Sequence, residues 1–306
     1  MHIVIPESIL PSAIQQLETA HSVHYDPNLV NKPDELIRAA KEADALIVRR
    51  LTQVRGELLD GMPRCKVVGR LGVGLDNIDT ATCSSRGIKV IPALGANALS
   101  VAEYVLAAAM TLVRGVFHST GEMVEGQWPK ERLNLGREVA GKTIGVVGFG
   151  SVGRVTAQLA EAVGMKVVVF DVSNSRADES RYERLSLAAL LECSDIVTLH
   201  VPLTDQTRSL INSERINKMK RGAILINAAR GGIVDDDAMI EALRSGQLGG
   251  AAVDAFENEP LAVSPQYRGL TNLILTPHVA GVTHESELRV TELVVARVLD
   301  ALRESA

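Results

Sequence analysis

The sequence lacks both a long uninterrupted hydrophobic run and a dense block of lysine and arginine. Its longest helical apolar stretch, YVLAAAMTLV, is too short to span a bilayer. The opening MHIVIPESIL lacks the basic region and long apolar region of a secretory signal. A formal net charge of −5 argues against nucleic acid or a membrane surface as a partner recognised by bulk charge. We therefore expect a cytoplasmic protein whose partners are small molecules.

Cysteine is scarce and is not arranged in pairs. The three cysteines, Cys65, Cys83 and Cys193, show no CxxC spacing, so neither a disulfide framework nor a zinc site is indicated. Low-complexity tracts and short-period repeats are also missing from the sequence. We expect reduced thiols, mostly buried, and no metal.

What the sequence does contain is a regular alternation of β-branched runs and helical patterns. The chain has 306 residues, enough for two domains of medium size. Its first third reads HIVI, SAIQQLETA, ALIVRR, KVVGRLG and IKVIPA, an order typical of parallel βαβ units. A long helix is predicted from about Ser100 to Gly121. An exposed arm, EGQWPKERLNLGRE, carries the single tryptophan and is predicted to follow it.

The alternation starts again at Lys142 and predicts six further strands. They are KTIGVVGFG, KVVVFD, DIVTLHVP, AILINAA, GGAAVDAF and NLILTPH. Six such strands suit a doubly wound parallel sheet that binds a dinucleotide. The stretch from His284 to Ala306 predicts one amphipathic helix that returns to the first domain.

The segment GVVGFGSVG predicts a phosphate-binding turn. Gly148, Gly150 and Gly153 have G-x-G-x-x-G spacing directly after a predicted strand, and RVTAQLAEAV continues as a helix. The first glycine permits a tight turn, the second lets backbone approach a pyrophosphate, and the third lets helix and strand pack closely. The helix N-terminus adds N–H donors and the positive end of a dipole.

The next strand, KVVVFD, ends in Asp171, at the distance where a carboxylate accepts hydrogen bonds from the adenosine ribose. A structural βα turn followed by a surface aspartate remains the alternative. A carboxylate would repel a 2′-phosphate, so NAD is favoured over NADP, although Arg176 lies close enough in sequence to leave the preference open.

Arg230 stands in an unusual segment, ILINAARGG. An apolar run typical of a strand buried on both faces leads into alanines, this arginine and two glycines, which are small enough for a ligand to approach. On this segment alone, a surface salt bridge explains the arginine equally well.

Several motifs together resemble the D-isomer-specific 2-hydroxyacid dehydrogenase family, over essentially the whole chain. They are GRLGVGLDNID, SVAEYVLAAAM, GKTIGVVGFGSVGR, HVPLTDQT, INAARGGIVDDDAM, AAVDAFENEP and LTPHVAG. The resemblance implies an α/β protein of two Rossmann-like domains with a cleft between them. Residues 1–98 and 284–306 would form a flavodoxin-like substrate domain, and residues 99–283 a doubly wound NAD-binding domain.

By the same resemblance, Arg230, Glu259 and His278 match the family's catalytic arginine, glutamate and histidine. The chemistry of hydride transfer at C2 of a 2-hydroxy acid independently requires a cation for the carboxylate and an acid/base for the C2 oxygen. The planar fork of Arg230 suits the first task, and the imidazole of His278 suits the second. Glu259 would pair with His278 and orient its ring. A packed histidine and a solvated glutamate are the ordinary alternatives.

The resemblance also assigns residues to the cofactor and to the substrate. Asp254 would accept a hydrogen bond from the carboxamide, and the backbone of the GVG loop would hold the substrate carboxylate. The expected cofactor residues are Gly148, Gly150, Ser151, Val152, Gly153, Asp171, Val201, Pro202, Ala228, Ala229, Arg230, Asp254, His278 and Gly281. The expected substrate residues are Arg50, Val73, Gly74, Arg230 and His278.

Arg50, in VRRLTQV, suggests the kind of substrate. It stands where many relatives carry a small or polar residue, so a second negative group on the substrate, as in sulfolactate, is the hypothesis. An Arg50 that points to solvent is the alternative. Hydroxypyruvate or glyoxylate reductase and phosphoglycerate dehydrogenase are the competing enzymes. An NAD-sensing scaffold like the family's corepressor branch is the competitor from another class. A homodimer is implied through the Ala-rich helix and the arm.

Overall fold

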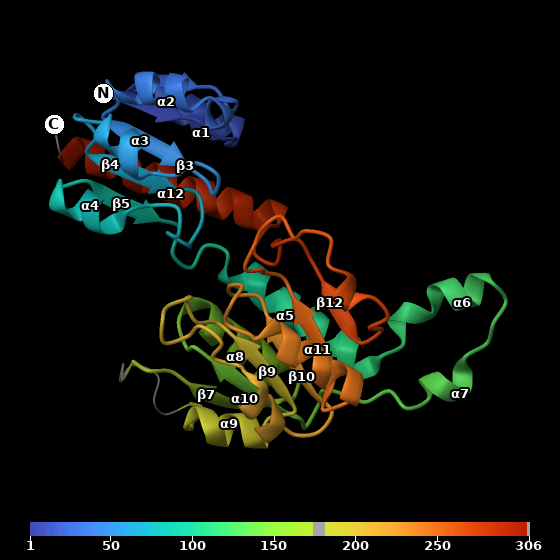
Figure 1. Ribbon diagram of the computed structural model, residues 1–306. Helices are drawn as coiled ribbons and strands as arrows, with labels where there is room; N and C mark the ends of the chain where they lie inside the picture. The colour runs from blue at the N-terminus through green and yellow to red at the C-terminus, as the bar shows by residue number, and fades with distance from the viewer. Residues whose placement is uncertain (174–180, 305–306) are drawn as a thin grey trace. The chain divides into compact units, whose positions relative to one another are not determined.

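The computed structural model describes residues 1–173 and 181–304. The chain divides into two compact units (Figure 1). Unit 1 comprises Met1–Asn97 and Val282–Ala306, and unit 2 comprises Ala98–Gly281. The first boundary was expected after residue 98 and lies after residue 97. The second was expected before residue 284 and lies before residue 282.

Unit 1 is built on a five-stranded parallel sheet with the order β2-β1-β3-β4-β5. This is the flavodoxin-like order expected of the first domain. The strands are β1 (His2–Ile5), β2 (Ser22–Tyr25), β3 (Ala45–Val48), β4 (Val67–Arg70) and β5 (Lys89–Pro92). The sequence prediction missed β2, because this edge strand is mostly exposed and reads SVHY, without an apolar run.

Helices cover both faces of the unit 1 sheet, and the C-terminal helix completes its core. Gly69 in β4 permits this packing, because a Cβ there would lie 2.8 Å from Val298 and 2.9 Å from Val294. The helices are α1 (Pro11–Glu18), α2 (Pro33–Ala40), α3 (Gly56–Asp60), α4 (Thr80–Ser85) and α12 (His284–Glu304), with a 3-10 turn η1 (Leu29–Asn31).

Unit 2 contains a seven-stranded parallel sheet with the order β12-β11-β10-β9-β6-β7-β8. The six predicted strands are confirmed, and β8 is an additional strand of two residues at the sheet edge. The strands are β6 (Thr143–Val147), β7 (Lys166–Phe170), β8 (Glu183–Arg184), β9 (Ile196–Leu199), β10 (Ala223–Asn227), β11 (Leu248–Val253) and β12 (Leu273–Leu275). β9 and β10 are buried along their whole length, as expected for inner parallel strands.

Apart from α6 and α7, the helices of unit 2 pack on this sheet or on the helices that cover it, and α5 lies against β10, β11 and α8. They are α5 (Ala98–Arg114), α6 (Thr120–Val124), α7 (Lys130–Leu133), α8 (Ser151–Ala162), α9 (Leu187–Cys193), α10 (Ser213–Lys218) and α11 (Asp236–Ser245), with 3-10 turns η2 (Phe117–Ser119) and η4 (Pro265–Tyr267). The prediction of one helix to Gly121 is wrong. Gly115, with a φ of +68°, ends α5 after Arg114.

In the part of the chain that the structure describes, no single helix is long and apolar enough to cross a membrane. α5 and the segment Phe117–Val124 meet those criteria only when they are joined, and they are bent by 72° at the break between them.

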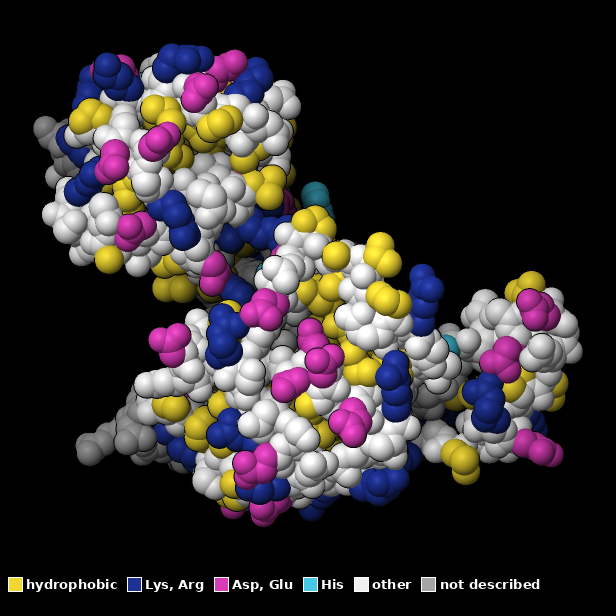
Figure 2. All heavy atoms as spheres, in the orientation of Figure 1, with side chains coloured by type: hydrophobic (Ala, Val, Ile, Leu, Met, Phe, Trp, Pro, Cys, Tyr) yellow, Lys and Arg dark blue, Asp and Glu magenta, His cyan; other side chains and the backbone are white. Residues whose placement is uncertain are grey.

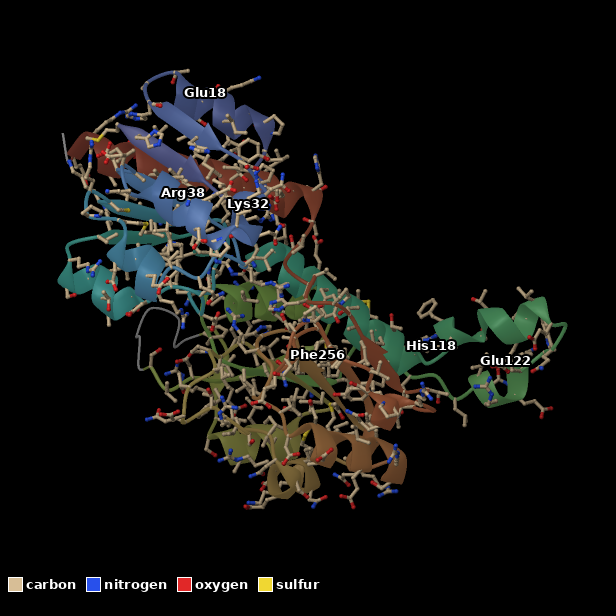
Figure 3. The ribbon with its side chains drawn as sticks, turned by 45° about the horizontal axis from the view of Figure 1, so that its top comes forward. Glu18, Lys32, Arg38, His118, Glu122 and Phe256 are labelled. Atoms are coloured by element: carbon tan, nitrogen blue, oxygen red, sulfur yellow. The ribbon has the colours of Figure 1, made fainter. Side chains whose placement is uncertain are left out.

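The predicted arm, apart from its last residue, belongs to a longer segment, residues 115 to 137, and from here on the arm means this whole segment. It extends away from the rest of unit 2 and carries α6 and α7 (Figure 1). Figure 3 labels His118 and Glu122 on it, and Figure 2 shows hydrophobic side chains among its charged ones. Four large apolar side chains of the arm are at least 65% exposed: Phe117, Val124, Trp128 and Leu135. Such exposure is unusual for a surface that contacts only solvent.

Candidate functional site

The parallel sheet of unit 2 brings most of the predicted site residues to one edge. The carboxyl ends of all its strands lie at that edge, and the strand order reverses between β6 and β9, where dinucleotides bind in doubly wound folds. Gly148 follows β6, Asp171 follows β7, Val201 and Pro202 follow β9, Ala228, Ala229 and Arg230 follow β10, Asp254 and Glu259 follow β11, and His278 follows β12.

Three glycines shape the turn between β6 and α8. Gly148 has a φ of +94°, and a Cβ there would lie 2.5 Å from the carbonyl oxygen of His200. A Cβ on Gly153 would lie 2.1 Å from the carbonyl oxygen of Gly148. Gly150, in contrast, has no heavy atom within 4 Å of the position that a Cβ would take. The outer glycines are therefore required by packing, whereas the middle one borders open space.

This contrast predicts different defects for two alanine variants. Gly153→Ala should lower the free energy of unfolding by about 1–3 kcal/mol, because its methyl group meets backbone. Gly150→Ala should cost less than about 1 kcal/mol of stability, as the residue before a helix, yet weaken NADH binding at least about tenfold. Thermal unfolding and NADH fluorescence titration measure the two effects. Unchanged NADH affinity in Gly150→Ala would contradict the assignment of the open space to the cofactor.

The N-terminus of α8 is suited to an anion. Its N-cap residue, Gly150, has an extended backbone and, being glycine, cannot cap the first-turn N–H groups with a side chain. The first-turn N–H groups, which belong to residues such as Ser151 and Val152, have no partner inside the helix by geometry. Together with the helix dipole, these donors can bind a pyrophosphate.

Asp171 lies beside the glycine turn. Its Oδ2 accepts the Phe149 N–H at 2.6 Å, and its Oδ1 accepts the N–H and hydroxyl of Ser173, both at 2.7 Å. Burial raises the pKa of this carboxyl, but the hydrogen bonds outweigh burial and the pKa lies below its ordinary value. The stabilisation is present above the ordinary pKa and is lost as the pH falls through the lowered one. Arg176, which bears on the choice between NAD and NADP, lies outside the described residues.

The loop after β9 closes over the glycine turn. Val201 Cγ1 would lie 2.9 Å from a Cβ on Gly148, and the Pro202 carbonyl accepts the Thr207 hydroxyl at 2.6 Å. Burial lowers the pKa of the neighbouring His200 to about 4, so its ring is uncharged at neutral pH. His200 is therefore poorly suited to exchange protons near neutrality.

The side chain of Asn227 folds the loop that carries Arg230. The Asn227 amide donates to the Arg230 carbonyl at 2.9 Å, and its oxygen accepts the Ala229 N–H at 3.2 Å. Arg230 Nη1 donates to the Ala229 carbonyl at 2.7 Å. Gly231 lies so close to the loop after β11 that a Cβ would fall 1.9 Å from the Phe256 carbonyl carbon. Arg230 is thus held on a turn fixed at both ends.

His278 and Glu259 form a hydrogen-bonded pair. His278 Nδ1 lies 2.8 and 2.9 Å from the two carboxylate oxygens of Glu259, and both side chains are partly buried. The Glu259 carboxylate also accepts the N–H of Phe256, labelled in Figure 3, at 3.0 Å. With Nδ1 occupied, Nε2 is the ring nitrogen that remains to exchange a proton with a ligand.

Asp254 holds the loop that carries His278, a role that the sequence prediction did not include. Its side chain is 1% exposed. It accepts hydrogen bonds from the Thr276 hydroxyl at 2.6 Å, the Val279 N–H at 2.9 Å and the Ala280 N–H at 2.8 Å. These bonds stabilise His278 in the left-handed region, at a φ of +57°. Oδ2 accepts only one of these bonds and can accept another. The predicted hydrogen bond from the nicotinamide carboxamide of the cofactor to Asp254 is compatible with this capacity and stays a prediction.

Tyr104 extends this network to α5. Its hydroxyl lies 2.7 Å from the hydroxyl of Thr276, which in turn donates to Asp254. Sequence reasoning missed Tyr104 and Thr276. Each residue lies in a segment that resembles the family, SVAEYVLAAAM or LTPHVAG, but 172 positions separate the two residues and no local signal pairs them.

Unit 1 contains the remaining predicted residues. Arg50 lies in the turn after β3, and Val73 and Gly74 lie in the loop after β4. The Arg70 side chain folds back over this loop and donates to the Leu71 carbonyl at 3.0 Å. Gly281 is the last residue of unit 2. Within residues 1–173 and 181–304, no three His, Cys, Asp or Glu side chains are grouped so that they could hold a metal ion.

Comparisons with known proteins agree with this geometry. Residues 106–280 match the family model described as "D-isomer specific 2-hydroxyacid dehydrogenase, NAD binding domain". The chain is 45% identical to (S)-sulfolactate dehydrogenase of Chromohalobacter salexigens, over 98% of each chain. It is 38% identical to hydroxypyruvate reductase of Thermotoga maritima, over 88% of each.

The fold matches solved structures as well. The crystal structure of the TT0316 protein from Thermus thermophilus has a TM-score of 0.90 and 33% identity, covering 99% of this chain and 97% of that one. The family resemblance and the α/β architecture predicted from the motifs are confirmed. The chain belongs to the D-isomer-specific 2-hydroxyacid dehydrogenase family and is an NAD-dependent oxidoreductase of 2-hydroxy acids.

Proposed function

We propose that the enzyme transfers a hydride between NAD and C2 of a small 2-hydroxy acid or its 2-keto acid, that this acid carries a second anionic group, and that sulfolactate is the specific substrate. The observation that supports the chemistry is the His278–Glu259 pair, at the same sheet edge as the glycine turn and Arg230. The substrate rests on Arg50 and on the 45% identity to a sulfolactate dehydrogenase.

His278 is the acid/base in this proposal. Glu259 fixes Nδ1, so Nε2 takes the C2 hydroxyl proton during oxidation and returns it during reduction. Glu259 does not need to touch the substrate and acts as a positioning residue for the ring.

Arg230 and the loop at Val73 and Gly74 bind the substrate carboxylate. The guanidinium offers two parallel N–H donors, and the loop offers backbone N–H groups. The same guanidinium polarises the C2 oxygen, on which negative charge develops in the transition state.

The residues at the sheet edge fit NAD. The cradle at Gly148, Gly150 and Gly153 with the α8 N-terminus would hold the pyrophosphate, and Asp171 the adenosine ribose. Val201 and Pro202 would lie near the adenosine, Ala228 and Ala229 beside the nicotinamide, and Asp254 and Gly281 near the carboxamide. NAD, when bound, supplies the hydride acceptor.

Steady-state kinetics test the substrate. Sulfolactate, malate, glycerate and lactate would each be offered with NAD while NADH absorbance is followed. We expect the highest kcat/KM for sulfolactate. Arg50→Met should lower that value about tenfold to a hundredfold, the loss of one charge-assisted hydrogen bond, with little change for lactate. Equal or better turnover of the monoanions would contradict the dianionic substrate.

Two other outcomes identify competing functions. Preferred reduction of hydroxypyruvate would favour the activity named for the Thermotoga maritima relative, and preferred reduction of glyoxylate would favour a glyoxylate reductase. NADH binding without turnover of any 2-hydroxy or 2-keto acid would favour the NAD-sensing scaffold.

We also propose a cytoplasmic homodimer. The arm supports dimerisation because Trp128 and Leu135 are 74% and 84% exposed. The cysteines are all free, which suits a reducing compartment. Light scattering should give twice the chain mass for the wild type and a lower mass for Trp128→Ser. A monomeric wild type would contradict the dimer.

A further inference from the structure

A buried carboxylate lies inside the turn that carries Arg50. Glu7 follows β1 and is 5% exposed. Its Oε1 accepts the N–H groups of Arg49 at 2.9 Å and Thr52 at 3.0 Å, and its Oε2 accepts that of Leu51 at 3.1 Å. Three of the four residues in the turn 49–52 are therefore bound through their backbone to one side chain.

The side chain of Asn77 binds the same turn through its carbonyl groups. Asn77 is 6% exposed, and its Nδ2 donates to the Arg49 carbonyl at 3.0 Å and the Thr52 carbonyl at 2.7 Å. Glu7 accepts from the turn and Asn77 donates to it, so the backbone donors and acceptors on either side of Arg50 are satisfied.

The neighbouring arginine has a different partner. Arg49 makes a bidentate ion pair with Glu287 of α12, with N···O distances of 2.5 and 2.6 Å, and also donates to the Ser8 carbonyl at 3.3 Å. Of the two arginines in VRRLTQV, Arg49 thus anchors the turn to the C-terminal helix.

The Glu7 carboxylate and the turn 49–52 depend on each other for their hydrogen bonds. Burying a carboxylate is unfavourable unless hydrogen bonds compensate, and the three N–H groups that donate to Glu7 all belong to this short turn. A loop held in this way presents its side chains with less entropy to lose when a ligand binds.

We infer that Glu7 and Asn77 are positioning residues that fix the turn 49–52 so that Arg50 meets the second anionic group of the substrate. The inference rests on the proposed function of Arg50. It adds two specificity-determining residues that do not need to contact the substrate themselves.

A double-mutant cycle tests this coupling. Glu7→Gln places an amide donor against backbone donors, and Asn77→Ala removes both bonds to the carbonyl groups. Either change should raise the KM for sulfolactate about tenfold, equivalent to about 1.4 kcal/mol, with kcat within about twofold. In an Arg50→Met background, the same changes should have little further effect, because coupled residues are not additive.

A matched control comes from the same sheet. Asp44 precedes β3, and its carboxylate, 8% exposed, accepts the His2 N–H at 2.7 Å, away from the turn 49–52. Asp44→Asn likewise replaces one oxygen of a buried carboxylate that accepts a backbone N–H with an amide donor, and we expect the KM of this variant to remain that of the wild type. Thermal unfolding and NADH titration on every variant show that each protein is folded and binds cofactor.

The outcomes separate the inference from the proposed function. A raised KM in Glu7→Gln and Asn77→Ala that disappears in the Arg50→Met background would support it. An equal effect with and without Arg50, or no effect in either variant, would overturn the inference alone. Wild-type kinetics in Arg50→Met itself would overturn the substrate assignment of Arg50 and the inference with it.

Discussion

Replacing His278 with asparagine should lower kcat about 10²–10⁴-fold while NADH binding stays close to that of the wild type. In the proposed mechanism the imidazole exchanges the C2 hydroxyl proton, because Glu259 occupies Nδ1 and Nε2 remains for the substrate. Asparagine fills similar space but cannot accept and return that proton near neutral pH.

Asparagine is chosen for its backbone preferences. His278 has a φ of +57°, a region that asparagine enters more readily than most residues other than glycine. The Asp254 bonds to Val279 and Ala280 should therefore survive the substitution, and the thermal unfolding midpoint should change little. Alanine at this position would combine the loss of the imidazole with backbone strain.

His24→Asn is the matched control. His24 lies on the exposed edge strand β2 of unit 1, so the same substitution there should leave kcat and KM unchanged. Single-turnover and steady-state rates with NAD and sulfolactate give the comparison. A His278→Asn enzyme that keeps more than about a tenth of kcat would place the acid/base on another residue.

The sequence predicted the strands that are apolar and missed the two that are not. β9 and β10 are continuous buried runs, and their inner position in a parallel sheet requires that composition. β2 and β8 lie at sheet edges, where exposed and charged residues are tolerated and no periodic signal arises. The helix predicted to Gly121 was too long, because one glycine of positive φ outweighed the helical pattern around it.

The residues of the candidate site also fall into two groups, those that local sequence signals predict and those that they do not. Glycine spacing and strand ends placed the turn at Gly148 and the residues after each strand, because these signals are local. The supporting side chains could not be predicted locally. Glu7 binds a turn 42 to 45 positions away, and Asp254 binds residues 22 to 26 positions away. Their partners are determined by strand order in the folded sheets, which a single sequence does not display.

Replacing Arg230 with lysine is expected to lower kcat/KM for the 2-hydroxy acid about a hundredfold, although the charge is retained. Lysine is a point charge and cannot make two parallel hydrogen bonds to a carboxylate. It also cannot reproduce the Nη1 bond to the Ala229 carbonyl while another nitrogen of the same fork faces the substrate. Asn227 holds the turn in both proteins, so unfolding should be nearly unchanged.

Arg208→Lys is the matched control, because Arg208 pairs with Glu257 at 2.6 Å on the surface of the same unit and should tolerate lysine.

The division of the Arg230→Lys effect between kcat and KM then identifies what the guanidinium does. A rise in KM alone would mean that Arg230 only binds the carboxylate, whereas an equal fall in kcat and kcat/KM would mean that it stabilises charge at the C2 oxygen in the transition state. The proposed role involves both the carboxylate and the C2 oxygen, so we expect both parameters to change. Restoration of kcat in Arg230→Ala by added guanidinium would assign the effect to that group. If Arg230→Lys has kinetics like those of Arg208→Lys, Arg230 does not act on the substrate, and the alternative role of a surface salt bridge would be favoured.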